Sequence, residues 1–135
     1  MEHIKSILEF KNYVVNEVIY KRNNNFNDKD ESISISLNIE PNIEINENSM
    51  IINLIAYIFE GAEENNYPFE MTVNITGHFE VQGESPRAYQ ANAIAILYPY
   101  IRAIVSTYTS AANIQPLILP AINVNAMLEN QNKKD

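Results

Sequence analysis

The alternation of apolar and polar residues predicts a β-sheet in the first part of the chain. In "SISISLNIEPNIEIN", residues 32–46, the large apolar residues all fall on odd positions, which is the period of a strand with one buried face. They are Ile33, Ile35, Leu37, Ile39, Ile43 and Ile45. Pro41 also falls on an odd position of this pattern. Because proline has no N–H to donate to a ladder, it marks an edge strand, a bulge or a break into two strands.

Three further segments favour strands. "FEMTVNITGHFEV", residues 69–81, alternates strictly, with Phe69, Met71, Val73, Ile75, Phe79 and Val81 on one side. "MIINLIAYIFEG", residues 50–61, has apolar residues at both odd and even positions and is rich in β-branched residues. This favours a strand covered on both faces over a short buried helix. "NYVVNEVIY", residues 12–20, also fits a helical spacing, but its β-branched and aromatic residues favour a strand from about Phe10.

After Gly83 the apolar period changes to that of a helix. Steps of three and four residues connect Ile94, Leu97, Ile101, Ile104 and Tyr108 into one seam along a long helix. Pro99 lies inside this helix, and its missing N–H predicts a kink or a second helix start there.

The carboxy-terminal part continues as an extended loop and a short helix. Asn113 is suited to a left-handed helix cap, and two prolines hold "QPLILPAIN" extended. A short helix is predicted over about Asn125 to Gln131. Earlier in the chain, "KRNNNFNDKDES" has no period and predicts a surface loop around Phe26. The whole chain, residues 1–135, is expected to form one domain, with residues 1–9 and 131–135 flexible.

Composition narrows the class of protein. The chain has 46% hydrophobic and 19% charged residues, which is typical of a globular fold, and it has no cysteine for a disulfide or a thiolate site. The start of the chain lacks the apolar core of a signal peptide, and no apolar run reaches the roughly 20 residues that cross a bilayer. We therefore expect a cytoplasmic protein without membrane insertion. The net charge of −8 argues against nucleic acid as a partner.

The residues offer little for catalysis. His3 and His78 have no ligand spacing around them, so surface histidines are favoured over a metal site. Glu63 and Glu64 stand beside two asparagines in an expected turn, where neither carboxyl is desolvated as acid–base catalysis requires. The three glycines are too far apart for a phosphate loop. We predict a protein that is not an enzyme and has no metal and no cofactor.

The long helix and its loop carry a family resemblance. "NAIAILYPYIRAIVSTYTSAANIQPLILPAIN", residues 92–123, resembles the carboxy-terminal half of the SecB family of protein-export chaperones. In that family an aromatic-proline-tyrosine-x-arginine helix precedes a leucine- and proline-rich loop that ends in asparagine. "PFEMTVNITGHFEV" and, more weakly, "FKNYVVNEV" are similar to family strands. The resemblance implies an α+β fold: a four-stranded antiparallel sheet, then a long helix, an extended loop and a short carboxy-terminal helix.

The resemblance also implies an assembly and an activity. The assembly is a homotetramer, a dimer of dimers whose long helices lie between two sheets. The seam from Ile94 to Tyr108 would then be the oligomer seam. The alternative is that this seam covers the sheet of its own subunit. The activity is ATP-independent holding of unfolded polypeptides for export in exposed apolar grooves. The implied client-binding residues are Phe26, Leu117, Ile118, Leu119, Ile122, Val124, Met127 and Leu128. Simple packing of the loop onto the core is the alternative for these side chains.

The partner surface departs from the family pattern. SecB proteins that deliver clients to the Sec motor ATPase present acidic residues on the outer sheet face. Glu17 matches one such position and Glu70 is a further candidate, but Lys21 and Thr72 stand where acids are expected. Some SecB-like proteins instead guard the antitoxin of a toxin–antitoxin pair, and the sequence leaves both roles open.

Two other classes of protein are weighed against a chaperone, and the first also wraps a long helix in a sheet. An enzyme of the hot-dog type places its helix early in the strand order, whereas this chain places the helix after every predicted strand. A carrier of small apolar ligands would enclose its cavity within one subunit, and it remains the alternative from a different class.

Overall fold

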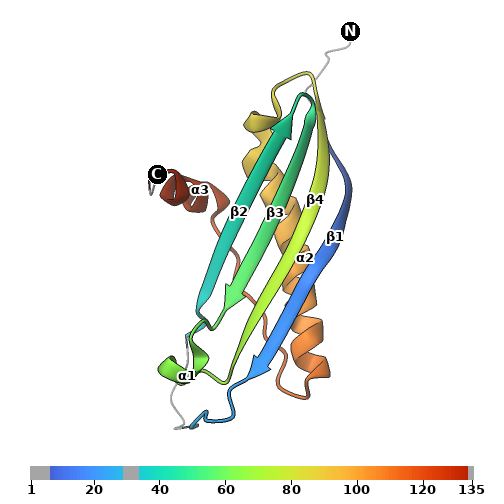
Figure 1. The fold of residues 1–135 in the computed structure, drawn as a ribbon. Helices are drawn as coiled ribbons and strands as arrows, with labels where there is room; N and C mark the ends of the chain where they lie inside the picture. Colours follow the sequence, from blue (N-terminus) through green and yellow to red (C-terminus); the bar gives the residue numbers. More distant parts are fainter. Residues whose placement is uncertain (1–6, 29–33, 134–135) are drawn as a thin grey trace.

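The computed structural model describes residues 7–28 and 34–133, which form one antiparallel sheet backed by a long helix (Figure 1). The strands are β1 (Ile7–Arg22), β2 (Leu37–Asn46), β3 (Ser49–Ile58) and β4 (Phe69–Gln82). The helices are α1 (Ala62–Asn65), α2 (Gln90–Ala111) and α3 (Val124–Lys133), with a 3-10 turn at Pro86–Tyr89. The order across the sheet is β1-β4-β3-β2, so β1 and β2 are the edge strands. This arrangement confirms the predicted fold class.

The strand β1 begins earlier than the sequence predicted. Its first residues pair with the end of β4, with Ile7 opposite Gln82 and Glu9 opposite Glu80. Residues 7–9 were expected to be flexible, and this expectation is wrong because the ladder with β4 orders them. Residues 1–6 of the same expectation lie outside the described part of the chain.

Pro41 lies within one continuous strand, and the edge interpretation of this proline is correct. The Phe59 N–H donates to the Ser36 carbonyl at 2.9 Å, so even-numbered residues of β2 form the hydrogen-bonded pairs with β3. The nitrogen of residue 41 therefore points away from β3, and the β2–β3 ladder loses no bond to the proline. The strand begins at Leu37, four residues after the predicted start at Ile33, which lies outside the described residues.

The core lies between the inner face of the sheet and α2. Large side chains with no exposed surface come from β3, β4 and α2; the largest include Met50, Ile52, Leu54, Ile58, Ile75, Ile94, Leu97 and Ile101. The two layers approach closely at Gly77, where an added Cβ would lie 2.5 Å from Leu97 Cδ2. Glycine is therefore required at this position for α2 to pack at its observed distance.

Among residues 7–28 and 34–133, no second layer covers the outer face of the sheet. The outward side chains of β3, such as Ile51 and Ile55, are half-buried, so the prediction that both faces of this strand are covered is wrong. Amide side chains cross the outer face from strand to strand. Asn42 Nδ2 donates to Asn53 Oδ1 at 3.2 Å, and Asn53 Nδ2 donates to Asn74 Oδ1 at 2.6 Å. Asn16 Nδ2 continues the series to Asn74 at 3.0 Å.

The helix α2 runs through Pro99 as a single element, so the predicted second start is not formed. Pro99 is exposed, on the side of α2 away from the sheet. Beyond the helix, Asn113 has φ of 64°, as expected of a left-handed residue after a helix end. The terminal helix α3 extends past both predicted bounds and includes residues 131–133, which were expected to be flexible. Residues 134–135 lie outside the described part of the chain.

Candidate functional site

The loop between α2 and α3 is tied to α2 by polar side chains. Tyr98 Oη donates to the Pro120 carbonyl at 2.5 Å, and Arg102 Nε donates to the Leu119 carbonyl at 3.1 Å. About two turns further along the helix, Thr109 Oγ1 accepts a hydrogen bond from the Leu117 N–H at 2.9 Å. These bonds satisfy three backbone groups of the loop and fix its path along α2, so its position does not depend on burying all of its side chains.

The apolar residues of this loop consequently have different environments. Leu119 has no exposed surface and belongs to the core, so its predicted role in client binding is wrong. Its neighbour Ile118 points the other way and is 70% exposed. Leu117 is half-buried against the core. An isoleucine this exposed on a hydrogen-bonded loop is a surface available to another molecule.

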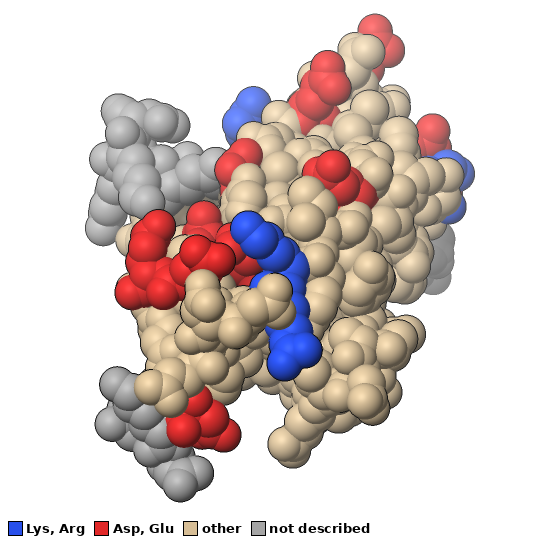
Figure 2. Space-filling view, turned by 60° about the horizontal axis from the view of Figure 1, so that its bottom comes forward, with Lys and Arg blue, Asp and Glu red and all other residues tan. Residues whose placement is uncertain are grey.

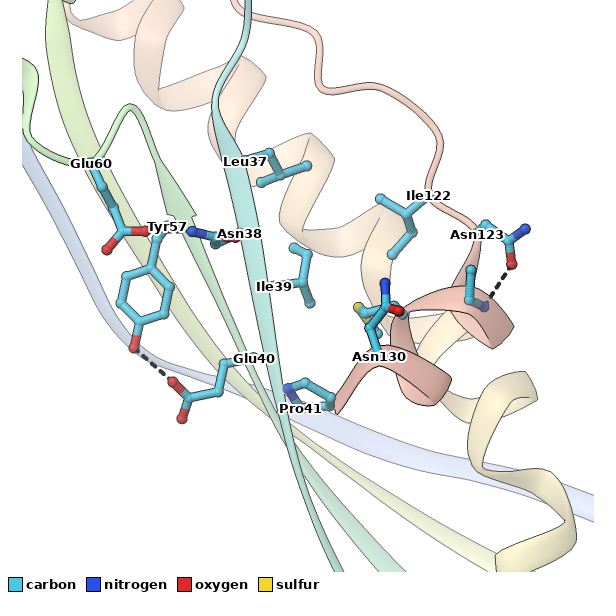
Figure 3. Close-up of a pocket in the computed structure, with 12 residues that line it drawn as sticks. Leu37, Asn38, Ile39, Glu40, Pro41, Tyr57, Glu60, Ile122, Asn123 and Asn130 are labelled. Atoms are coloured by element: carbon cyan, nitrogen blue, oxygen red, sulfur yellow. Dashed lines mark hydrogen bonds between the residues drawn. The ribbon is translucent and has the colours of Figure 1, made fainter. Parts of the chain in front are cut away.

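One hollow lies beside the loop, between the edge of β2 and α3, and we call it the lateral groove (Figure 3). It has a volume of about 880 Å³. One wall is formed by Leu37, Ile39 and Pro41, which lie on the side of β2 that faces the loop and α3. Ile122 and Met127 form the opposite wall, on the loop and on α3. The helix α3 packs against α2, which keeps this wall in place.

The other side of β2 gives the lateral groove an acidic rim. Tyr57 Oη donates to Glu40 Oε1 at 3.2 Å, and Asn38 Nδ2 donates to Glu60 Oε1 at 2.8 Å. Desolvation raises the pKa of Tyr57, and the two carboxylates raise it further, with Glu40 the stronger. The hydroxyl therefore stays protonated and can hold its bond to Glu40 throughout the neutral range. The groove thus has an apolar inner side and an acidic outer side.

A second hollow, the end groove, lies where β1 and α2 end, and its volume is about 770 Å³. Its floor is a group of aromatic rings from three strands or their ends. The ring centroids of Tyr20 and Phe69 are 5.2 Å apart, and Phe59 meets Phe69 edge to face at the same distance. Phe26 and Leu117 lie on its walls. Such a floor suits large apolar or aromatic side chains.

A buried asparagine supports the end groove. Asn23 Nδ2 donates to the carbonyls of Tyr67 at 2.9 Å and Ala62 at 3.1 Å, and its Oδ1 accepts the Asn25 N–H at 3.0 Å. The segment that follows β1 was predicted to be a surface loop, but Asn23 is 4% exposed and connects this loop to α1. This residue escaped notice because nothing in an asparagine-rich sequence distinguishes a buried amide from solvated ones.

The two grooves divide the predicted client-binding residues. Ile122 and Met127 line the lateral groove, while Phe26 and Leu117 line the end groove. Val124 and Leu128 are half-buried against the core and line neither hollow. The aromatic floor and the β2 wall were missed. Alternation along a strand shows which side chains face inward, but it does not show which of them extend beyond the covering helix.

The predicted oligomer seam is mostly internal. Ile94, Leu97 and Ile101 have no exposed surface and cover the sheet of their own subunit, so assigning them to a seam between subunits is wrong. Ile104 is half-buried, and Tyr108 is 41% exposed. The stripe that α2 turns away from the sheet carries small uncharged residues instead, among them Ala95, Pro99 and Ala103.

The predicted docking residues lie on the outer sheet face. Glu17 is exposed opposite Asn74, and Glu70 is half-buried directly opposite Lys21. At the end of the molecule that carries α1, acidic side chains gather beside a smaller basic group (Figure 2). Opposite charges on adjacent strands lower the net negative potential that Glu70 presents.

The described residues, 7–28 and 34–133, contain no group of three or more histidine, cysteine, aspartate or glutamate side chains placed to hold a metal ion. Within the same ranges, every helix is too short or too polar to cross a bilayer. What the site provides is open apolar surface beside acidic groups.

A family model and two known proteins are similar to this chain over most of its length. A family model described as "Preprotein translocase subunit SecB" matches residues 15–135. An uncharacterized protein of Methanocaldococcus jannaschii is 35% identical, over 93% of this chain and 85% of its own length. The protein-export protein SecB of Anaplasma phagocytophilum is 32% identical, over 75% of this chain and 60% of its own length.

Two solved structures share the fold. A SecB-like chaperone of Mycobacterium tuberculosis, in complex with a peptide from an antitoxin, has a TM-score of 0.66 and 15% identity, covering 85% of this chain and 90% of its own. A protein of unknown function from Streptococcus agalactiae has a TM-score of 0.54 and 13% identity, covering 87% of this chain and 100% of its own.

Proposed function

This chain belongs to the SecB family, whose chaperones are not enzymes, and we propose that it is a cytoplasmic, ATP-independent holdase for unfolded polypeptides. The observation that carries the proposal is Ile118, which is 70% exposed on a loop fixed to α2 by three hydrogen bonds, between two open grooves that each have an apolar side. A fixed apolar surface captures extended chains at a low entropic cost, because little of the surface must be ordered on binding. The net charge of −8 keeps such a surface soluble.

The test is the dilution of a chemically denatured, aggregation-prone protein into buffer with and without the chaperone, in the absence of nucleotide. We expect light scattering to fall with rising chaperone concentration. Replacing Ile118 by Ser should weaken this suppression, while Asn48→Ser, an exposed change in the turn between β2 and β3 that lines neither groove, serves as the control. Scattering that the wild-type chain leaves unchanged would refute the holdase function.

The destination of the clients has two candidates. The family description and the Anaplasma relative support delivery to the protein-export machinery, with Glu17 and Glu70 as the docking residues for the motor ATPase. Lys21 opposite Glu70 weakens this candidate, because a basic partner would meet a like charge there. The structural neighbour with an antitoxin peptide supports the second candidate, a chaperone dedicated to an antitoxin. A pull-down with purified motor ATPase, comparing wild type with Lys21→Glu, separates the two.

We also propose that the functional form is a homotetramer, a dimer of dimers. The exposed stripe of α2 supports this proposal, because Ala95 and Ala103 allow a second helix to approach closely. Replacing Ala103 by Glu should reduce the particle from about 62 kDa, four times the 15.4 kDa chain, to dimers or monomers in multi-angle light scattering. A wild-type chain that elutes as a monomer would contradict the tetramer.

A further inference from the structure

We infer that Asn23 and Asn66 are positioning residues of the end groove, because their side-chain amides hold the Phe26 ring at its wall and keep the aromatic floor open. The described part of the loop after β1, residues 23–28, lies at the same end of the molecule as α1 (Figure 1). The side-chain bonds of the two asparagines join this loop to the segment between β3 and β4, and we call them the amide clamp. The inference rests on the proposed holdase function and explains how one of its grooves stays accessible.

Asn23 forms the buried half of the amide clamp. It is 4% exposed, and its Nδ2 donates to the Tyr67 carbonyl at 2.9 Å and to the Ala62 carbonyl at 3.1 Å. Its Oδ1 accepts a hydrogen bond from the Asn25 N–H at 3.0 Å. Both ends of the amide are therefore used, the donor end across to the α1 segment and the acceptor end within the loop. A carboxylate at this position would have no N–H to donate and would face two carbonyl oxygens.

Asn66 forms the outer half of the amide clamp through a reciprocal pair of bonds with the backbone of Asn27. The Asn27 N–H donates to Asn66 Oδ1 at 2.8 Å, and Asn66 Nδ2 donates to the Asn27 carbonyl at 2.9 Å. Asn66 also has φ of 55°, in the left-handed region that favours glycine and asparagine. Glycine would suit this backbone conformation equally well but would lose both side-chain bonds.

Phe26 lies between the two halves of the amide clamp. Its N–H donates to the Asn23 carbonyl at 3.1 Å, and the next residue, Asn27, is bound to Asn66. The chain is thus fixed on both sides of the ring. The ring itself is half-buried and lines the end groove. Its position at the wall therefore follows from the two asparagines.

The segment held by the amide clamp contains a strained residue. Phe59 has φ of 56°, a conformation that bulky residues rarely adopt, and it is 4% exposed within the aromatic floor. Its N–H donates to the Ser36 carbonyl at 2.9 Å, and its ring packs on Tyr67 with the centroids 4.8 Å apart. The carbonyl of the same tyrosine accepts a bond from Asn23. Such strain persists only where surrounding contacts hold it, and it is concentrated at functional sites.

Without the amide clamp, the loop would close the end groove with its own aromatic ring. The aromatic floor offers the kind of surface on which a free ring packs, because this removes apolar area from water. The covalent tether gives Phe26 a high effective concentration, against which a separate client has to compete. By fixing the chain on both sides of the ring, the clamp keeps the volume of about 770 Å³ open.

A tryptophan in place of Phe26 reports the position of the ring, because the chain has no other tryptophan. We expect Phe26→Trp with Asn66→Gly to emit at a shorter wavelength than Phe26→Trp alone, since the released ring is buried on the aromatic floor. The matched control is Phe26→Trp with Glu47→Gly, which changes another left-handed residue, in the turn between β2 and β3, and should cause no shift. An unchanged or longer emission wavelength with Asn66→Gly would overturn the inference.

A photo-reactive peptide shows the consequence for clients. The probe is a nine-residue peptide of glycine, serine and lysine with a central benzoylphenylalanine, irradiated with the full chain. Mass spectrometry gives the ratio of cross-links at the end groove, such as Tyr20 and Leu117, to cross-links at the lateral groove, such as Ile39 and Met127. The ratio compares two sites on the same folded molecules, so a general loss of stability leaves it unchanged.

We expect Asn66→Gly to lower this ratio about tenfold, because the amide clamp loses two hydrogen bonds. Asn23→Asp should lower it by a similar factor. Its matched control, Asn25→Asp, adds the same charge to an exposed residue two positions away and should change the ratio by less than about twofold. Either clamp variant suffices if the other does not fold, and an unchanged ratio in a folded clamp variant would overturn the inference.

Removal of the ring shows whether the amide clamp acts through Phe26. In a Phe26→Ala background, adding Asn66→Gly should change the ratio by less than about twofold, because no ring remains to cover the floor. The same tenfold loss in that background would show that the amides only stabilise the loop, and it would overturn the inference. Cross-links at neither groove of the wild-type chain, together with the expected tryptophan shift, would refute the holdase function and leave the positioning of Phe26 standing.

Discussion

The helix α2 and the loop that follows it are both rich in apolar residues, yet they place these residues in opposite ways. On α2, Ile94, Leu97 and Ile101 recur on one face and have no exposed surface. In the loop, consecutive residues point in different directions, so Leu119 is buried while Ile118 is 70% exposed. A regular period turns apolar composition into burial, whereas a loop fixed by hydrogen bonds can leave apolar side chains in solvent.

The largest effect should come from the two neighbours in the loop. Replacing Leu119 by Ala should lower the free energy of unfolding by about 2–5 kcal/mol, because it leaves a cavity in the core. The matched change Ile118→Ala should alter it by less than about 0.5 kcal/mol. Urea unfolding at equal chain concentration measures both. Similar losses for the two variants would contradict the contrast between a buried and an exposed loop residue.

The next effect concerns the contact between α2 and the sheet. Replacing Gly77 by Ala should cost about 1–3 kcal/mol, since the new methyl group overlaps the Leu97 side chain. Shortening that side chain makes room, so the double variant Gly77→Ala with Leu97→Ala should be more stable than the sum of the two single changes indicates. A double-mutant cycle from denaturant unfolding measures this coupling. Strict additivity would show that the two residues do not limit the approach of α2.

The smallest effect concerns the polar side chains that fix the loop. Replacing Tyr98 by Phe should lower the free energy of unfolding by about 1 kcal/mol and should weaken client capture, because the bond to the Pro120 carbonyl is lost. Arg102→Lys serves as the comparison variant, because it keeps the positive charge beside the neighbouring Leu119 carbonyl. Unchanged client capture by Tyr98→Phe would show that the loop holds its course without this bond.

The same variant has a pH signature. Burial raises the pKa of Tyr98, and Arg102 lowers it by a smaller amount. The unfolded chain therefore loses this proton at a lower pH than the folded chain, so the stabilisation is complete below about pH 10 and is lost as the pH rises through the folded pKa. The stability difference between wild type and Tyr98→Phe should be constant up to about pH 10 and shrink above it. A difference that grows with alkaline pH would reverse this sign.

Much of the fold could be predicted from the sequence because it depends on periodicity. The period of two in β2 and β4, and the steps of three and four along α2, follow from strand and helix geometry alone. Where the pattern was ambiguous, pairing with a neighbouring strand decided the secondary structure. The strand β1 fits a helical spacing as well, and it became a strand because β4 offers it a ladder from Ile7 to Arg22.

The candidate site was predicted only in part. The apolar composition of the loop and of α3 indicated Ile118, Ile122 and Met127, but it gave Leu119 the same role. The residues of the aromatic floor, Tyr20 and Phe69, look like core residues in the sequence, since they occupy inward positions of their strands. Their membership of a groove depends on where the covering helix ends.

The sequence by itself determined the periods of β2, β4 and α2 and the inward face of each, the absence of cysteine chemistry and a family resemblance that the comparisons confirm. Only the tertiary structure decided which apolar residues remain in solvent, and which strands form the edges of the sheet. The physical reason is that burial and hydrogen bonding are properties of pairs of segments. The exposure of Ile118 depends on side chains about ten to twenty residues earlier in α2, and the edge position of β2 depends on the order of four strands.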